Sequence, residues 1–392
     1  MSSPLPLAGR KLWFVGIGGA GLSAYAQLAR AWGAEVGGWD HVDTPYLDPL
    51  RDVPLALSPE PTVPEGWEAV VSSAYPGVQG IRRPAFLREL VSVRPAIVVA
   101  GAHGKGTTAA MIAVGLADAG LDPAWLIGAP VPQLGSNAGS GKGWLVVEGD
   151  ESDRTVFSLP AQIAVLTNLD LDHHTEFASE AELVAAFEGW LAAAAQVVRD
   201  APPYDGLLGV PGELNRLNAG AAFKALELAG VSADDAASSL ARFTGTGRRF
   251  EVHELGGVTI VDDYGHHPTE LAATIAAVRE RFPGARLHVL FQPHLYSRTR
   301  HLAPEFADAL AGADDITVTD IYPAREAPIA GVTGKLIVDE LSDRGRLVGW
   351  MPAVEQGVAY VQARALPGDV VLVAGAGDID RAVGLLAAGA RR

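Results

Sequence analysis

Short apolar runs alternate along most of the chain with stretches whose apolar positions have helical spacing. The helical stretches include residues 22–32, 107–120 and 215–230. Apolar strands that alternate with helices are typical of parallel sheets covered by helices on both faces. The pattern therefore predicts an α/β protein with ten buried strands: Leu12–Val15, Glu35–Trp39, Ala69–Ser72, Ala96–Ala100, Trp144–Glu148, Ile163–Thr167, Val258–Val261, Leu287–Phe291, Ile316–Thr319 and Val370–Ala374.

The same pattern predicts three domains. A second strand–glycine–helix unit begins near residue 95, and the glycine-rich segment 243–249 separates it from a third group of strands. We expect domains over 1–94, 95–244 and 245–392. A chain of 392 residues is long enough for two or three separate cores.

Composition excludes several classes of protein. The chain has no cysteine, which rules out disulfides, thiolate nucleophiles and cysteine-based zinc sites. Its 30 basic and 46 acidic residues give a net charge of −16 without a basic cluster, so we expect no nucleic-acid partner. Apolar runs fall short of the roughly 18 residues that a membrane helix needs. We therefore expect a cytoplasmic protein with no membrane insertion.

A glycine loop follows the first strand. Gly16, Gly18 and Gly21 have the spacing of a nucleotide-binding turn, and Asp40 ends the next strand, where an acid would contact a ribose. Backbone amides at a helix N-terminus suit a diphosphate. The same fingerprint would suit NAD, or a turn that only packs helix on strand, so the ligand stays open at this point.

A second glycine loop, 101–108, follows the strand Ala96–Ala100. Lysine occurs only five times in the chain, and Lys105 lies within this loop. Gly104 allows close approach of the backbone to phosphates, Lys105 supplies a positive charge, and Thr107 or Thr108 offers a hydroxyl to Mg²⁺. The alternative is an ordinary capped turn.

Acidic clusters end the next two strands. Residues 148–153 hold four carboxylates, and residues 168–174 combine an asparagine and two aspartates with two histidines. Carboxylates so close together repel one another unless a cation or solvent intervenes. Beside a phosphate loop they favour a divalent metal, with a solvated loop as the alternative. In the last domain, residues 291–300 offer an imidazole and two guanidiniums to a carboxylate or phosphate.

Together these strings resemble the Mur ligase family over essentially the whole chain. The most specific match is Asp-Asp-Tyr-Gly-His-His-Pro-Thr-Glu at 262–270, and residues 16–23, 101–108, 150–153, 168–173, 291–300, 321–328 and 375–379 follow family patterns as well. The resemblance implies a Rossmann-like N-terminal domain, a P-loop-type central ATPase domain and a Rossmann-like C-terminal domain. It also implies an ATP- and Mg²⁺-dependent ligase of peptidoglycan precursor synthesis, on the branch that joins L-alanine to the carboxylate of UDP-N-acetylmuramate through an acyl phosphate.

The resemblance assigns roles to individual residues. UDP-substrate binding falls to Gly16, Gly18, Gly19, Gly21, Asp40, Ser72 and Ser73. ATP binding falls to Gly101, His103, Gly104, Lys105, Gly106, Thr107, Thr108, Asn215, Asn218, Arg249, Asp263 and His266. Metal binding falls to Thr107, Glu151 and His173, and the catalytic roles to Lys105, His294 and Arg298.

The chain departs from the family pattern at four places. Gly106 replaces a threonine, Leu214 a histidine, and Leu295 an arginine that would pair with a substrate anion. The segment between His173 and Asn215 is also shorter than the family pattern, so the central domain is expected to be trimmed.

Three alternatives remain beside alanine ligation. A tripeptide-ligating relative would use the same chemistry with a larger acceptor. An NAD-dependent oxidoreductase would explain residues 16–21 but neither 101–108 nor 168–173. A non-catalytic protein that binds the UDP-muramoyl compound would fit Leu295 and the short middle segment. We expect a monomer or weak homodimer.

Overall fold

The computed structural model describes residues 5–151, 153–169, 177, 179–324 and 326–389. The chain divides into two compact units, residues 1–209 with 216–246 and residues 210–215 with 247–392. The predicted domains 1–94 and 95–244 both fall largely in the first unit, so their boundary stays a prediction. The predicted start of the third domain, at 245, lies next to the change of unit at 246–247.

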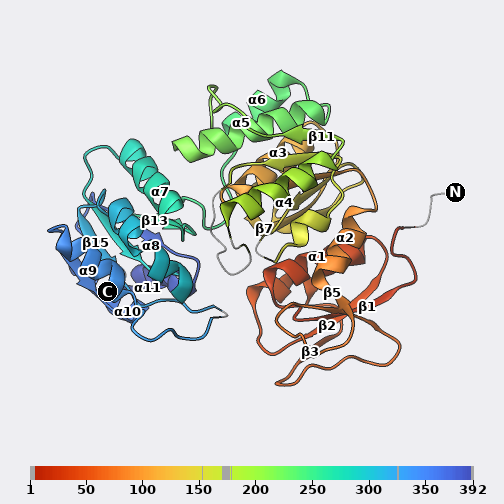
Figure 1. The fold of residues 1–392 in the computed structure, drawn as a ribbon, viewed down its shortest axis with the longest axis horizontal. Helices are drawn as coiled ribbons and strands as arrows, with labels where there is room; N and C mark the ends of the chain where they lie inside the picture. Colours follow the sequence, from red (N-terminus) through yellow and green to blue (C-terminus); the bar gives the residue numbers. More distant parts are fainter. Residues whose placement is uncertain (1–4, 152, 170–176, 178, 325, 390–392) are drawn as a thin grey trace. The chain divides into compact units, whose positions relative to one another are not determined.

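The first unit begins with a parallel five-stranded sheet in the order β3-β2-β1-β4-β5. Helix α1 follows strand β1 and helix α2 follows β5 (Figure 1). The short 3-10 helix η1 follows β2. The strands are β1 (Lys11–Val15), β2 (Glu35–Asp40), β3 (Leu55–Leu57), β4 (Glu68–Val71) and β5 (Ile81–Arg82), and the helices are α1 (Ala20–Ala31), η1 (Pro45–Leu50) and α2 (Arg83–Val91).

The second sheet of this unit has six strands in the order β11-β10-β6-β9-β7-β8, parallel except for the pair β7–β8. Its strands are β6 (Ala96–Ala100), β7 (Ala124–Val131), β8 (Ser136–Ser140), β9 (Leu145–Glu148), β10 (Ile163–Leu166) and β11 (Gln196–Val198). Its helices are α3 (Lys105–Asp118), η2 (Pro132–Leu134), η3 (Thr155–Ser158), α4 (Glu180–Ala192), α5 (Glu213–Leu228) and α6 (Ala233–Arg242).

One hydrophobic core joins the two sheets of the first unit. Buried residues from α1, such as Leu28, belong to the same cluster as Ala124 and Leu126 of β7. Asn137 of β8 adds a polar contact, since its Nδ2 donates to the carbonyl oxygen of Ala20 at 3.1 Å. The glycine loops of the two sheets are therefore held in one packed body.

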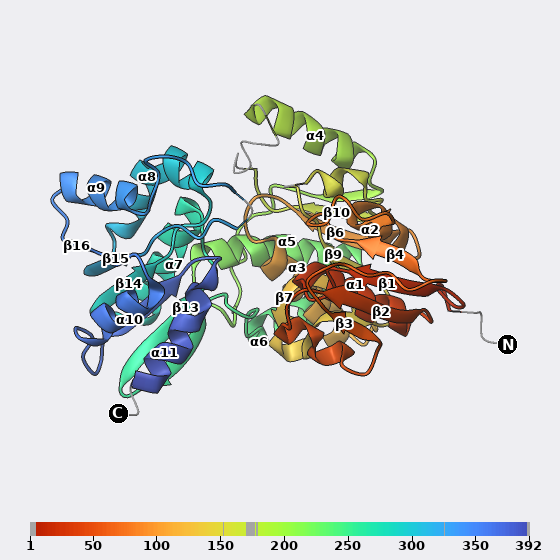
Figure 2. The same ribbon diagram turned by 90° about the horizontal axis from the view of Figure 1, so that it is seen from below.

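The second unit has a six-stranded sheet in the order β12-β13-β17-β14-β15-β16, parallel except for β12. Helices α7, α8 and α9 lie on one face and α10 and α11 on the other (Figure 2), over two separate apolar clusters. The strands are β12 (Glu251–Leu255), β13 (Val258–Asp263), β14 (Leu287–Phe291), β15 (Asp315–Val318), β16 (Val348–Trp350) and β17 (Val370–Ala374). The helices are α7 (Pro268–Arg281), α8 (Tyr296–Leu310), α9 (Lys335–Asp343), α10 (Val354–Gln362), η4 (Asp378–Asp380) and α11 (Arg381–Gly389).

The α/β class predicted from the sequence is confirmed, and all ten expected strands are present, three with the predicted bounds and seven with ends shifted by one or two residues. Seven further strands, β3, β5, β7, β8, β11, β12 and β16, were not predicted. Among the described residues, no helix combines the length and the apolar character needed to cross a membrane.

Candidate active site

The first glycine loop lies between β1 and α1 and is held by Asp40. The carboxylate Oδ2 of Asp40 accepts a hydrogen bond from Gly18 N at 2.7 Å, and the hydroxyl of Thr44 donates to Gly18 O at 2.7 Å. Asp40 is buried. It therefore shapes the loop, and its assignment to the uridine of the UDP-substrate stays a prediction.

Ser72 lies against the start of the same loop. A β-carbon placed on Gly16, whose φ is +91°, would lie 2.9 Å from the β-carbon of Ser72. Ser72 follows β4, the neighbour of β1, and Ser73 next to it is exposed. Gly19 caps the N-terminus of α1, which Gly21 continues. The residues predicted to bind the UDP-substrate thus gather at the carboxyl ends of β1, β2 and β4, the edge where parallel sheets bind ligands.

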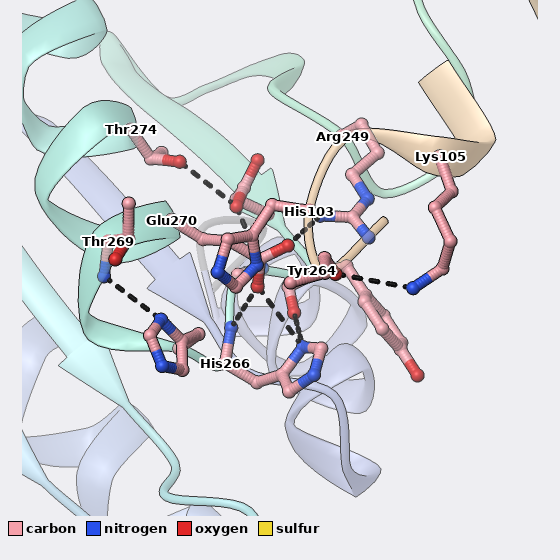
Figure 3. Close-up of polar contacts among 12 residues, drawn as sticks. His103, Lys105, Arg249, Tyr264, His266, Thr269, Glu270 and Thr274 are labelled. Carbon is pink, nitrogen blue, oxygen red and sulfur yellow. Dashed lines mark hydrogen bonds and ion pairs between the residues drawn. The ribbon is translucent and has the colours of Figure 1, made fainter. Parts of the chain in front are cut away.

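Lys105 opens α3 at the end of the second glycine loop, which follows β6. Its ammonium group donates to the carbonyl oxygens of Gly101 at 2.7 Å and Ala102 at 3.2 Å (Figure 3). It also pairs with the carboxylate of Glu151 at 3.0 Å. Both side chains are largely buried, at 15% and 4% exposure. The ammonium group of Lys105 thus contacts both the glycine loop and the acidic turn.

The acidic turn keeps Lys105 charged. Burial alone would lower the pKa of the Lys105 ammonium, but the carboxylates of Glu151, Asp150 and Glu148 outweigh it and raise this pKa above its ordinary value. An ammonium with a raised pKa is fully protonated at neutral pH. The side chain can therefore neutralise a phosphate that displaces Glu151.

Thr167 and Asn168 hold the backbone of His103 in this loop. The Asn168 amide accepts from His103 N and donates to His103 O, both at 2.9 Å, and the Thr167 hydroxyl donates to the same oxygen at 2.7 Å. The sequence placed Asn168 in a metal and phosphate site. The structure gives it a bracing role.

The position of Gly104 leaves no room for a side chain. It has a φ of +76°, and a β-carbon there would overlap Oδ1 of Asn218, which is buried. Asn218 thus lies against the loop that is assigned to ATP, and its own assignment to ATP binding stays a prediction. Asn215, one turn earlier on α5, donates to the carbonyl oxygen of Pro211 at 2.7 Å.

The predicted metal ligands are partly in place. Thr107 and Thr108 are buried in the first turn of α3, and Gly106 faces Glu148. Within the described part of the chain, Thr108 Oγ1 has no hydrogen-bond partner, and no three histidine or acidic side chains gather as a metal cluster. Mg²⁺ is usually held by one or two carboxylates together with substrate phosphates, so one threonine hydroxyl and Glu151 fit that use. His173 lies outside the described residues.

In the second unit, Arg249 and Asp263 belong to a buried network. Arg249 Nη1 donates to Glu270 Oε1 at 3.1 Å, and Figure 3 shows His266 at the same carboxylate through its backbone N–H, at 3.1 Å. Asp263 accepts from Phe250 N at 2.9 Å, Gly265 N at 2.8 Å and the Thr274 hydroxyl at 3.1 Å. Burial raises the pKa of the Asp263 carboxyl despite Arg249 nearby.

His294 and Arg298, predicted from one motif, are in contact. Arg298 Nη1 lies 3.1 Å from His294 Nδ1, and Arg298 is 2% exposed. A guanidinium can only donate, so Nδ1 accepts and the imidazole proton lies on Nε2. The ring of His294 stacks on that of Tyr322, with 5.9 Å between the ring centroids, and meets the ring of His266 edge-on, with 5.5 Å between the centroids. With its proton on Nε2, the His294 imidazole can donate a hydrogen bond to a carboxylate. It cannot take up a proton at that nitrogen, so it is less suited to the role of general base.

Leu295, next to His294, has a strained backbone, with φ +72° and ψ +132°. Such a conformation costs a non-glycine residue on the order of 1–3 kcal/mol. It is held by hydrogen bonds from Leu295 N to Tyr322 O at 3.0 Å and from the Thr299 hydroxyl to Leu295 O at 2.9 Å. The sequence analysis singled out Leu295 only because it replaces an arginine of the family pattern, and nothing in the sequence indicated this backbone strain.

Two polar residues near the candidate site residues, one in each unit, were missed from sequence. Arg83, on α2, donates to Asp153 at 3.2 Å, and Glu326 accepts from Ser297 N at 2.9 Å and from its hydroxyl. Neither lies in a glycine motif or an acidic cluster. The adjacent arginines Arg82 and Arg83, placed just before Pro84, were the one local signal.

Comparisons with known proteins identify the family of the chain. The family model described as "Mur ligase, glutamate ligase domain" matches residues 248–377. The UDP-N-acetylmuramate–L-alanine ligase of Paenarthrobacter aurescens is 37% identical, with 94% of each chain covered, and that of an Arthrobacter species is 41% identical, with 92% of this chain and 90% of the relative covered.

Solved structures extend the likeness to the fold. The crystal structure of the UDP-N-acetylmuramate–alanine ligase MurC from Thermotoga maritima superposes with a TM-score of 0.79, at 24% identity, over 97% of this chain and 99% of that one. A murein peptide ligase from Psychrobacter arcticus gives a TM-score of 0.68 at 20% identity, over 97% and 99% of the two chains. Given the identity and coverage of its sequence relatives, the chain belongs to the Mur ligase family, on the branch of the UDP-N-acetylmuramate–L-alanine ligases.

Proposed function

We propose that this protein joins L-alanine to the carboxylate of UDP-N-acetylmuramate with the hydrolysis of ATP, in the synthesis of peptidoglycan precursors. The observation that carries the proposal is the identity of 37–41% to ligases of that name over nine tenths or more of both chains. The placement of Lys105 and Glu151 beside a glycine loop supports it independently, because the reaction needs an ATP site.

The reaction has two steps. A carboxylate oxygen of UDP-N-acetylmuramate attacks the γ-phosphorus of ATP, and ADP leaves with the electron pair of the broken P–O bond. The nitrogen of L-alanine then attacks the resulting acyl phosphate, phosphate leaves, and the amine loses a proton. In the first step both partners are anions, so positive charge beside the phosphates is the main requirement.

The residues of this chain divide the work between the substrates. Lys105 binds the transferred phosphate, while the N-terminus of α1, which Gly19 caps and Gly21 continues, binds the diphosphate of the UDP-substrate. Arg298 and the Nε2 proton of His294 bind the carboxylate of the amino acid. Glu151 and Thr107 or Thr108 would hold Mg²⁺ together with the ATP phosphates, where the metal would supply positive charge against theirs. We place the reaction in the cytoplasm and propose a monomer or weak homodimer.

Phosphate release tests the proposal. We expect release from ATP and Mg²⁺ to depend on UDP-N-acetylmuramate and on L-alanine, with serine and glycine as poorer acceptors. Lys105→Ala should lower kcat by at least about a hundredfold, because it removes a charge from the transition state. Lys142→Ala is the matched control, since that lysine is exposed.

Other results would redirect the assignment. Release with the tripeptide L-Ala-D-Glu-diamino acid in place of L-alanine would favour the tripeptide-ligating activity. Binding of UDP-N-acetylmuramate without any ADP formation would favour a non-catalytic protein. Wild-type activity in Lys105→Ala would contradict the assigned ATP site.

A further inference from the structure

Arg83 lies between the two glycine loops of the first unit. It begins α2, whose side chains pack in the common core with those of α1. A β-carbon placed on Gly21, in the first turn of α1, would lie 3.5 Å from Arg83 Nε and 3.8 Å from Nη2. Its guanidinium therefore stands beside the N-terminal turn that is assigned to the diphosphate.

The other side of the Arg83 guanidinium faces the acidic turn. Arg83 Nη1 donates to Asp153 Oδ2 at 3.2 Å, and the two side chains are 23% and 26% exposed. Asp153 also accepts from Thr155 N at 3.0 Å, which fixes it at the start of η3. Glu151, two residues before Asp153, pairs with Lys105.

These contacts are two ion pairs on one acidic turn. Arg83, beside the α1 loop, pairs with Asp153, and Glu151, two residues earlier in the chain, pairs with Lys105 of the ATP loop. Every member belongs to the first unit, so the two loops are linked inside one packed body.

A cation beside the N-terminus of α1 is unfavourable by itself, because the helix already presents partial positive charge there. Burial would lower the pKa of Arg83, but Tyr25, Asp153 and Asp150 raise it, so the guanidinium is charged. A guanidinium has five N–H donors, more than Tyr25 and Asp153 together require. A second anion, bound to the Arg83 guanidinium together with Asp153, would explain why this cation lies beside the N-terminus of α1.

We propose that Arg83 is a positioning residue that couples the two substrate sites by contacting the diphosphate of the UDP-substrate while it holds Asp153. The inference rests on the proposed function. A bound diphosphate fixes the Arg83 guanidinium, and the guanidinium then fixes Asp153 and the turn that carries Glu151. The UDP-substrate thereby prepares the acidic turn for the metal–nucleotide complex, and each ligand tightens the binding of the other.

Titration calorimetry measures this coupling directly. The Kd of Mg²⁺ with AMP-PNP is determined with and without saturating UDP-N-acetylmuramate, and the ratio of the two values is the coupling factor. We expect a factor of about 5 or more in the wild type, in the range usual for coupled sites. The reverse titration must give the same factor, because linkage is reciprocal.

Variants on both sides of the ion pair should lose the coupling. In Arg83→Ala and in Asp153→Asn the factor should fall to about 1, and Arg83→Lys should keep part of it, since charge remains without the planar fork. Asp153→Asn keeps the shape of the side chain, so it tests the inference even if Arg83→Ala folds poorly. Arg88→Ala, an exposed arginine on the same helix, should keep the wild-type factor.

The outcomes separate this inference from the proposed function. A wild-type factor of 1, or an unchanged factor in Arg83→Ala or Asp153→Asn, overturns the coupling role. Failure of the wild-type protein to bind UDP-N-acetylmuramate at all overturns the proposed function instead. Loss of coupling in both variants, with Arg88→Ala unchanged, supports the inference. UDP alone in place of UDP-N-acetylmuramate should produce most of the coupling, because the contact is to the diphosphate.

Discussion

Arg249 is the cation that faces two buried carboxylates of the second unit, Glu270 and Asp263. Arg249→Met keeps much of the stem but removes the charge. We expect a loss of about 3–5 kcal/mol in the free energy of unfolding at pH 7.5, as when one partner of a buried ion pair is removed. Chemical denaturation followed by fluorescence measures it.

The pH dependence of the same variant provides a second check. The folded pKa of Asp263 is already raised by burial, and removing Arg249 raises it further. A carboxyl with a raised folded pKa contributes its full stability below its unfolded pKa, about 3.9, and loses it as pH rises through the folded value. The deficit of Arg249→Met should therefore be smaller at pH 5 than at pH 7.5. A deficit independent of pH would contradict this account, and Arg281→Met, at an exposed arginine, should show neither effect.

Helix α8 receives its N-terminal cap from a distant loop. Leu295 precedes the helix and has no polar side chain, while Glu326 accepts from Ser297 N at 2.9 Å. Glu326→Ala should lower the free energy of unfolding by about 1 kcal/mol, the usual value of a cap. Because Arg298 directly follows Ser297 in the first turn of α8, the variant should also raise KM for L-alanine several-fold and leave KM for ATP nearly unchanged.

The control for this helix is Glu305→Ala, at an exposed position further along α8. It should leave both KM values unchanged. Equal increases of the two KM values in Glu326→Ala would point to general loosening of the unit and would contradict a local role.

The strands that the sequence analysis predicted are the interior ones. β6 and β17 are apolar along their whole length, and β1 and β14 each contain a single polar residue, Lys11 and His288. Such runs are visible in the sequence because the strands are buried on both faces. The unpredicted strands are mostly short edge strands, such as β5 and β16, or the antiparallel strands β8 and β12. Most of these residues become strands by pairing with a neighbour, without a strong local signal. The exception is β7 (Ala124–Val131), an interior and largely apolar strand that the sequence analysis missed.

For the site, sequence reasoning found the residues that end strands or lie in glycine loops. Lys105, Glu151 and Gly18 are examples, because the edge of a parallel sheet is determined by chain order. It did not find Arg83, which begins a helix and reaches Asp153 through tertiary packing. It also gave no sign that the carboxylate of Asp40, assigned to the UDP-substrate, accepts a hydrogen bond from Gly18 N. Whether a polar side chain faces a ligand or braces a loop depends on neighbours that chain order does not specify.

At the scale of the whole molecule, the division into two compact units predicts two unfolding transitions. The residues assigned to the UDP-substrate all lie in the first unit, so this ligand should stabilise that unit alone. At about a hundred times its Kd the ligand adds about 2.7 kcal/mol. For a unit of this size that corresponds to a rise of roughly 5–10 °C in Tm. Differential scanning calorimetry with and without UDP-N-acetylmuramate should therefore move one transition and leave the other in place, whereas a common shift of both would show that the units unfold together.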